Sequence, residues 1–154
     1  MNCNVVLVNP DIPQNTGNIA RLTAGLGCQL HVVKPMGFEI TDKNVKRAGL
    51  DYWPEVKLQV HDNWQAFLAD TGAEANQMWF FSTKASNCFT TVTYRPGDYL
   101  VYGSETKGLN EWFHHEYPDR RVQIAIENPN IRSFNLSNAV AVGLFEARRC
   151  IVTK

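Results

Sequence analysis

The sequence predicts an α/β fold in which a mostly parallel sheet is covered by helices on both faces. Short apolar runs, typical of buried strands, alternate along the chain with stretches of helical spacing. The 154 residues, 44% of them hydrophobic, are enough for a sizeable core, and no internal repeat, linker or low-complexity segment divides them. We therefore expect a single domain that spans residues 1–154.

The N-terminal part begins with a buried strand over residues 4–8 and a loop over residues 9–17 that is rich in turn formers. Asn15 or Thr16 is expected to cap the helix that follows, because a short polar side chain can accept hydrogen bonds from the first backbone N–H groups. The helix should end at Gly27, since glycine suits the left-handed conformation of a C-cap.

Strands and helices continue to alternate through the rest of the chain. Further strands are predicted at residues 30–33, 56–60, 78–82, 99–102 and 122–126. Short helices are predicted at residues 41–48, 64–68 and 110–117. Ligands bind beyond the carboxyl ends of the strands in such a sheet, so the loops there should carry the chemistry. Four of these loops have unusual compositions: residues 9–16, 83–85, 103–108 and 127–135.

The last predicted helix, residues 136–147, has no charged residue before Glu146. Three small polar residues can each cap its start: Ser133, Asn135 and Ser137. Its apolar residues form two sides, with Leu136, Val140 and Leu144 on one and Ala139, Val142 and Phe145 on the other. One side can pack on the sheet. The other needs a further cover, and a second subunit would provide it.

The composition argues against several classes of protein. No signal-like N-terminus and no apolar run long enough to span a bilayer are present, so we expect a cytoplasmic protein without membrane contact. The scattered cysteines are expected to be reduced, and the four histidines lack the spacing of a ligand set, so no metal is expected. Zero net charge argues against binding nucleic acid by bulk charge alone but allows a local basic surface.

Two features suggest chemistry without proving it. Gly103-x-Glu105-x-x-Gly108 follows a predicted strand, and a ligand could approach its backbone closely; a plain glycine-bounded turn is an equally good interpretation. Arg21 could present its planar guanidinium to a phosphate or carboxylate, or could simply be a surface residue. The chain lacks a dinucleotide fingerprint, a P-loop and a G-x-S-x-G elbow, so Ser104 is not expected to be a nucleophile.

Three stretches together resemble the SPOUT superfamily of RNA methyltransferases. They are Asn9-Pro-x-x-Pro-x-Asn15-x-Gly17-x-x-x-Arg21, Gly103-x-Glu105-x-x-Gly108-Leu109 and Arg132-Ser133-x-Asn135-Leu136-Ser137-Asn138. Their order and spacing match the three motifs of that superfamily over nearly the whole chain. Three further stretches look like the small tRNA 2'-O-methyltransferases that act on the wobble ribose of leucine tRNAs: Pro13 to Ile19, Gly49 to Tyr52 and Gly97 to Leu100.

The resemblance implies a deep trefoil knot near the C-terminus, a homodimer, and S-adenosyl-L-methionine as the cofactor. The cofactor would lie bent in the knot, held largely by main chain, with apolar side chains around its adenine. The implied cofactor-binding residues are Phe81, Ser82, Thr83, Gly103, Glu105, Gly108, Ile124, Ile126, Ser133, Phe134 and Leu136.

The implied reaction is methylation of the ribose 2'-hydroxyl of the wobble pyrimidine in tRNA, with leucine isoacceptors as the expected substrates. We expect Arg21 to grip the adjacent phosphate and stabilise developing negative charge, because arginine stays protonated at neutral pH. The implied catalytic residues are Arg21, Asn15, Glu105, Ser133 and Asn135. The implied RNA-binding residues are Arg21, Lys46, Arg47, Lys84, Lys107 and Arg132.

Two other functions remain open at this point. The same chemistry could act on another tRNA or ribosomal RNA site, since no appended RNA-binding domain reveals the target. The chain could also be a non-catalytic RNA-binding module of the same fold, because close relatives often carry Tyr where this chain has Phe145, and the phenol is missing.

Overall fold

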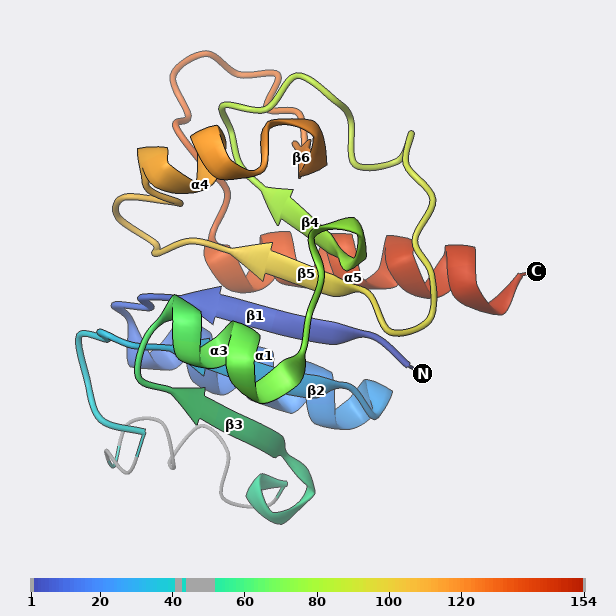
Figure 1. Ribbon diagram of the computed structural model, residues 1–154. Helices are drawn as coiled ribbons and strands as arrows, with labels where there is room; N and C mark the ends of the chain where they lie inside the picture. Colours follow the sequence, from blue (N-terminus) through green and yellow to red (C-terminus); the bar gives the residue numbers. More distant parts are fainter. Residues whose placement is uncertain (1, 41–42, 44–51, 154) are drawn as a thin grey trace.

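A computed structural model describes residues 2–40, 43 and 52–153, and its centre is a six-stranded sheet (Figure 1). The strand order is β3-β2-β1-β5-β4-β6, and every pairing between neighbouring strands is parallel. The strands are β1 (Asn4–Val8), β2 (Gln29–Val33), β3 (Lys57–His61), β4 (Met78–Phe81), β5 (Tyr99–Tyr102) and β6 (Arg121–Val122). The expected α/β class with a parallel sheet is confirmed.

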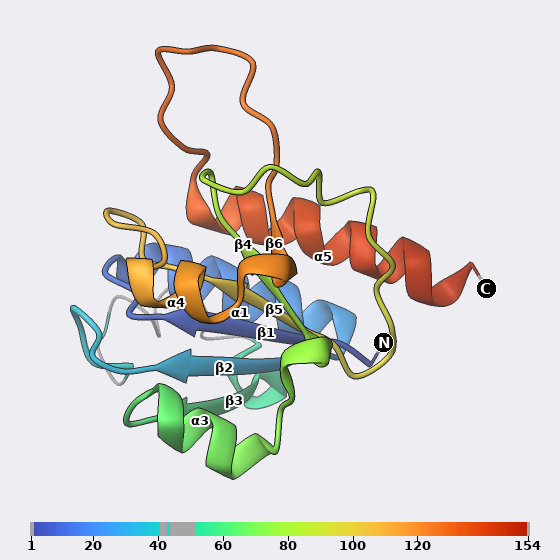
Figure 2. The same ribbon diagram turned by 45° about the horizontal axis from the view of Figure 1, so that its top comes forward.

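Helices cover both faces of the sheet (Figures 1 and 2). The helices α1 (Pro13–Leu26) and α5 (Leu136–Val152) pack on one face, and α3 (Trp64–Thr71) and α4 (Glu111–Glu116) pack on the other. Alternate strand residues supply the two cores: Val5 and Leu7 face α1 and α5, whereas Val6 and Val8 face α3 and α4. Short 3₁₀ helices complete the fold: η1 (Trp53–Glu55), η2 (Ala75–Gln77) and η3 (Pro118–Arg120).

The start of α1 differs from the prediction. The helix begins at Pro13, with Ile12 as the N-cap residue, so Asn15 and Thr16 lie inside it and are buried rather than capping it. Proline is well suited to a first helical position, because its missing N–H would have had no partner within the helix. The other end agrees with the prediction, since Gly27 adopts the left-handed conformation with φ of 67°.

Other helices and strands also begin or end at residues that differ from the predicted ones. The last strand was expected at 122–126, but β6 stops at Val122; Gln123 forms only an isolated bridge to Cys88, and the chain then leaves the sheet. The last helix extends past its expected end to Val152. Strand β3 starts one residue later than expected and, being an edge strand, buries only His61 rather than alternating. The helix expected at 41–48 lies almost wholly outside the described residues.

The helix α5 has two apolar sides, as expected. Val140 and Leu144 are fully buried against the sheet and α1, whereas Val142 and Phe145 are 46% and 52% exposed. Among the residues that the structure describes, nothing therefore covers Val142 and Phe145 on the second side.

Candidate cofactor and RNA site

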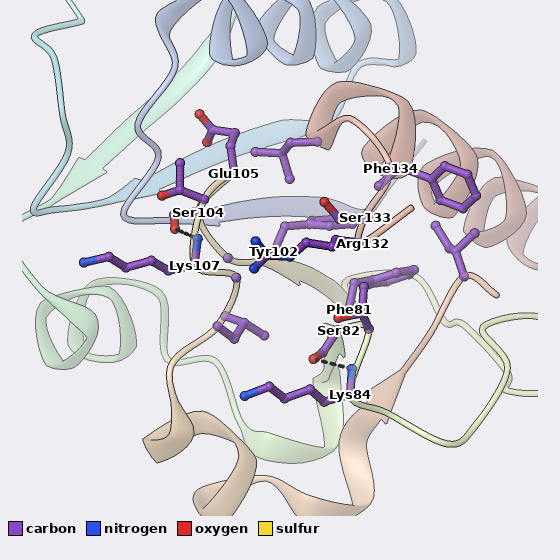
Figure 3. Close-up of a pocket in the computed structure, with 18 of the residues that line it drawn as sticks. Phe81, Ser82, Lys84, Tyr102, Ser104, Glu105, Lys107, Arg132, Ser133 and Phe134 are labelled. Atoms are coloured by element: carbon purple, nitrogen blue, oxygen red, sulfur yellow. Dashed lines mark hydrogen bonds between the residues drawn. The ribbon is translucent and has the colours of Figure 1, made fainter. Parts of the chain in front are cut away.

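A cavity of about 540 Å³ lies at the carboxyl ends of β4 and β5 (Figure 3). This is where a parallel sheet places its ligands, and the volume falls within the range of small-molecule sites. All eleven residues expected to bind the cofactor line it: Phe81, Ser82, Thr83, Gly103, Glu105, Gly108, Ile124, Ile126, Ser133, Phe134 and Leu136. They come from four separate segments, which the fold brings to one place.

The turn over residues 103–108 forms one wall of the cavity. Gly103 has no room for a side chain, because a Cβ there would lie 2.1 Å from the carbonyl carbon of Gly108. Gly108 has a φ of +65°, and its N–H donates to the Ser104 carbonyl at 2.9 Å, which closes the turn. Both glycines are thus required by the backbone of this turn.

The floor of the cavity is aromatic. The rings of Phe81 and Tyr102 stack with centroids 4.6 Å apart and an interplanar angle of 21°. A Cβ on Gly143 of α5 would lie 2.3 Å from the Tyr102 hydroxyl, so only glycine lets α5 approach this closely. Burial raises the pKa of the Tyr102 phenol well above its usual value, so it stays neutral.

Glu105 lines the cavity, but its carboxylate points away from the centre toward the loop before α1 (Figure 3). It accepts hydrogen bonds from the backbone N–H of Asp11, at 3.2 Å, and from that of Ile12. The adjacent Thr106 hydroxyl donates to the Asp11 carboxylate at 2.7 Å. A carboxylate here also lies at the positive end of the α1 dipole. Glu105 therefore ties the second motif to the first.

A second contact ties the first motif to the third. The Asn135 side-chain amide donates to Asn15 Oδ1 at 3.1 Å, across 120 residues of sequence. Asn135 Oδ1 also accepts from the backbone N–H groups of Ser137, at 2.9 Å, and Asn138, so it is the residue that caps α5. Ser133 lies exposed at the cavity edge.

Arg21 lies apart from these residues. It is exposed on α1, it does not line the cavity, and its guanidinium carbon lies 5.4 Å from the centroid of the Tyr52 ring. Of the five expected catalytic residues, the fold therefore joins Asn15 to Asn135 and places Glu105 and Ser133 along the cavity, while Arg21 stands on the outer surface of the same helical layer.

Three of the expected RNA-binding residues surround the cavity. Arg132 points into it, and Lys107 points outward from the turn (Figure 3). Lys84 Nζ lies 2.5 Å from Glu111 Oε1 of α4, and this ion pair holds the pKa of the Glu111 carboxyl below its usual value. Lys46 and Arg47 lie outside the described residues. The cavity mouth is thus basic although the chain as a whole carries no net charge.

Besides Ser104 and Thr106, which lie within the expected 103–108 loop, three cavity residues were not among the expected site residues: Tyr102, Leu109 and Ala139. Each had a local signal. Tyr102 is the last residue of a predicted strand, Leu109 directly follows the second glycine of the turn, and Ala139 lies one helical turn after Leu136. Continuing each motif by one structural step would have found them.

Elsewhere, His31, His61 and His114 are buried and His115 is exposed. Within the described residues, no group of three or more histidine, cysteine or acidic side chains is arranged to hold a metal ion. The described helices include none that is both long and apolar enough to cross a membrane.

The second and third motif segments line one cavity, and the first motif is hydrogen-bonded to both of them; this arrangement defines a methyltransferase-type α/β fold of the SPOUT class. Comparison with protein families agrees: the model of the SpoU rRNA Methylase family matches residues 2–145. A tRNA (cytidine(34)-2'-O)-methyltransferase of Methylovorus glucosotrophus is 47% identical over 146 residues, covering 94% of this chain and 93% of that protein. The chain therefore belongs to the SpoU methylase family.

Solved structures support the same assignment. A structure described as giving insight into the 2-OH methylation of C/U34 on tRNA has a TM-score of 0.88 and 41% identity, covering 96% of this chain and 95% of that one. The SpoU methyltransferase AviRb from Streptomyces viridochromogenes, in complex with the cofactor AdoMet, has a TM-score of 0.83. It shares 20% identity and covers 95% of this chain and 59% of that one, so it shows the fold alone.

Proposed function

We propose that this protein transfers a methyl group from S-adenosyl-L-methionine to the ribose 2'-hydroxyl of the wobble pyrimidine in tRNA, with leucine isoacceptors as its substrates. The observation that carries the proposal is a cavity lined by two of the motif segments, both hydrogen-bonded to the third, in a chain 47% identical to a tRNA (cytidine(34)-2'-O)-methyltransferase. We expect the protein to act in the cytoplasm, as a homodimer with a trefoil knot at the C-terminal part of the chain.

The cavity fits the cofactor in size and chemistry. Its volume of about 540 Å³ suits a molecule of that size, and apolar side chains for the adenine are present at Ile124, Ile126 and Leu136. The Glu105 carboxylate already accepts hydrogen bonds from the backbone N–H groups of Asp11 and Ile12, and it points away from the cavity centre. Arg132 points into the cavity and offers a partner for the carboxylate of the methionine moiety (Figure 3).

The bound cofactor supplies a methyl group on a positively charged sulfur. The ribose hydroxyl is a poor acid and must lose its proton as its oxygen attacks, so holding that oxygen in line with the methyl carbon is the larger contribution. Asn15 and Asn135, fixed by their mutual hydrogen bond, would shape this part of the site together with Ser133. Arg21 would grip the adjacent phosphate and stabilise negative charge that develops on the oxygen.

The homodimer has its own support. The outer side of α5 exposes Val142 and Phe145, and the helix starts at the third motif, so a subunit packed there would lie beside the site. Such a contact between identical faces is typical of two-fold dimers. The dimer would thus cover the exposed side of α5 that carries Val142 and Phe145.

Nucleoside mass spectrometry tests the proposal. Transfer RNA from a strain without the gene is incubated with the purified protein and S-adenosyl-L-methionine, and any new methyl group is located by oligonucleotide mapping. A 2'-O-methyl pyrimidine at the wobble position of leucine tRNAs is the expected result. A methyl group at another RNA site would change the substrate and keep the chemistry. No methyl group on any RNA, with the cofactor bound, would favour a non-catalytic RNA-binding module.

A further inference from the structure

Trp112 on α4 stands out among the tryptophans because it is 44% exposed, whereas Trp64 and Trp79 are buried. Its ring is nevertheless held in place. It meets Phe113 edge to face with centroids 5.0 Å apart and Tyr117 at 6.1 Å, with interplanar angles of 84° and 83°. A fixed, exposed indole loses little conformational freedom when something packs on it.

The helix that carries this indole follows directly on the cavity wall. Trp112 lies three residues after Leu109, which lines the cavity, and next to Glu111, whose ion pair with the cavity residue Lys84 ties the start of α4 to the cavity. Figure 1 shows α4 where the strands of the sheet end. Trp112 is therefore on the helix that adjoins the site to which a methylated nucleotide must come.

The surroundings favour RNA over a protein as the occupant. Among the large apolar side chains of α3 and α4, both fully described, Trp112 alone is strongly exposed, and its neighbours Glu111 and His115 are polar. A protein interface needs a contiguous apolar patch, such as the one on α5. A single flat ring, on a helix that follows a cavity lined by Lys84, Lys107 and Arg132, is instead suited to stack an unpaired base.

We propose that Trp112 is a stacking platform for an unpaired base next to the methylated nucleotide. The inference rests on the proposed function, since it takes the RNA to be the unpaired anticodon loop around position 34. The platform would hold the flanking base while the ribose enters the cavity, and so would favour substrates whose target nucleotide is single-stranded. Trp112 contacts substrate but takes no part in the transfer itself.

The test uses an anticodon stem-loop RNA with C34 in which one base flanking C34 is replaced by 2-aminopurine, whose fluorescence falls when it stacks. Wild-type protein should quench one of the two flanking probes. Trp112→Ala should abolish this quenching and weaken binding about 10-fold. Trp112→Phe should retain most of both. Val60→Ala, which shortens an exposed apolar side chain on the far edge strand β3, is the control and should change neither.

Methyl transfer to the same stem-loop adds a second readout. For Trp112→Ala, KM for the RNA should rise about 10-fold, and kcat at saturating RNA should stay within about twofold of the wild-type value, since the platform acts in binding. Unchanged affinity and persistent quenching would overturn the proposal. So would dissociation of the dimer by Trp112→Ala, which would mark a protein contact. Binding and quenching by wild-type protein without methyl transfer would refute the proposed function and leave the platform standing.

Discussion

The two helical layers differ in how completely this chain buries them. Beneath α3 and α4, Trp64, Phe67 and Phe113 are buried in a network of ring contacts. In the other layer, α5 buries Val140 and Leu144 but leaves Phe145 half exposed. The incomplete layer is also the one whose helix α5 begins at the third motif and lines the cavity.

This difference separates two tasks. Apart from the exposed Trp112, the large apolar side chains of the α3/α4 layer are covered within the described part of the chain, and we call it the finished layer; substitutions inside it should affect stability. The α1/α5 layer carries the motif residues and an uncovered apolar side, so substitutions on its surface should affect activity and assembly. The four predictions below test this separation.

The largest effect is expected in the finished layer, from Phe67→Ala. Phe67 is fully buried and touches both His31 and His61, with centroids 5.4 and 5.3 Å apart. The cavity left behind should lower the free energy of unfolding by about 3–5 kcal/mol in urea titrations. Cofactor affinity of the folded protein should stay within about twofold. If the alanine variant does not fold, Phe67→Leu can be measured in its place, since it should lower the free energy of unfolding by less than about 2 kcal/mol. A loss of cofactor affinity in the leucine variant would contradict the separation.

On the α1/α5 layer, Arg21→Ala is the substitution to compare with Phe67→Ala, because it should change activity rather than stability. Methyl transfer should fall about 100- to 1000-fold, because a cation that stabilises developing charge is removed. The free energy of unfolding should change by less than about 0.5 kcal/mol, since Arg21 is exposed. Arg21→Lys keeps the charge without the planar fork and should recover only part of the rate. Unchanged methyl transfer in Arg21→Ala would refute the catalytic assignment.

The finished layer should also respond to pH. His31 Nδ1 lies 3.0 Å from His61 Nε2, and His61 Nδ1 lies 2.8 Å from the half-exposed Asp70 carboxylate. Burial, and then the neighbouring His61, lowers the pKa of His31 from 6.5 to about 4. Between pH 6.5 and about 4, His31 therefore binds a proton in the unfolded chain but not in the folded chain. The contribution of neutral His31 to the free energy of unfolding is fully present above pH 6.5 and is lost as pH falls toward 4.

The loss should reach about 3 kcal/mol at most, measured as the free energy of unfolding between pH 7 and pH 4. His31→Leu is the control, because the difference between the two proteins cancels other titrating groups such as Asp98, whose pKa burial raises. Equal pH slopes in the two proteins would show that His31 does not titrate in this way.

The sequence predicted most elements because their signals are local. The αL C-cap at Gly27 and the cap at Asn135 need only a few neighbouring residues, and the apolar run at 99–102 became β5 without change. The end of β6 could not be read in this way. Its pairing stops where Gln123 bridges to Cys88, which depends on a segment far away in sequence.

The features of the site also differ in whether they depend on local sequence or on distant contacts. The loops that line the cavity were predicted, because a parallel sheet fixes where its strand ends meet. The contact of Glu105 was not, since its backbone partners lie more than ninety residues earlier. Glu105 was expected to shape the loops and position the ribose; its hydrogen bonds fix the start of α1, and its role at the ribose stays a prediction. Local sequence therefore reports where chemistry gathers better than what each side chain does there.

The smallest expected effect, and the sharpest test of the incomplete layer, comes from Phe145→Asp. If α5 packs against its copy in a partner, the substitution places two carboxylates in a buried apolar contact, and the dimer should dissociate at least about 10-fold more readily. The measurement is sedimentation at micromolar concentrations. The monomer should keep its stability, because Val140 and Leu144 still face the core. Val60→Asp makes the same change at an exposed site on β3 and should leave the dimer intact. A Phe145→Asp protein that sediments like the wild type would show that the exposed side of α5 does not pack against a second copy. That result would refute the proposed homodimer contact through α5.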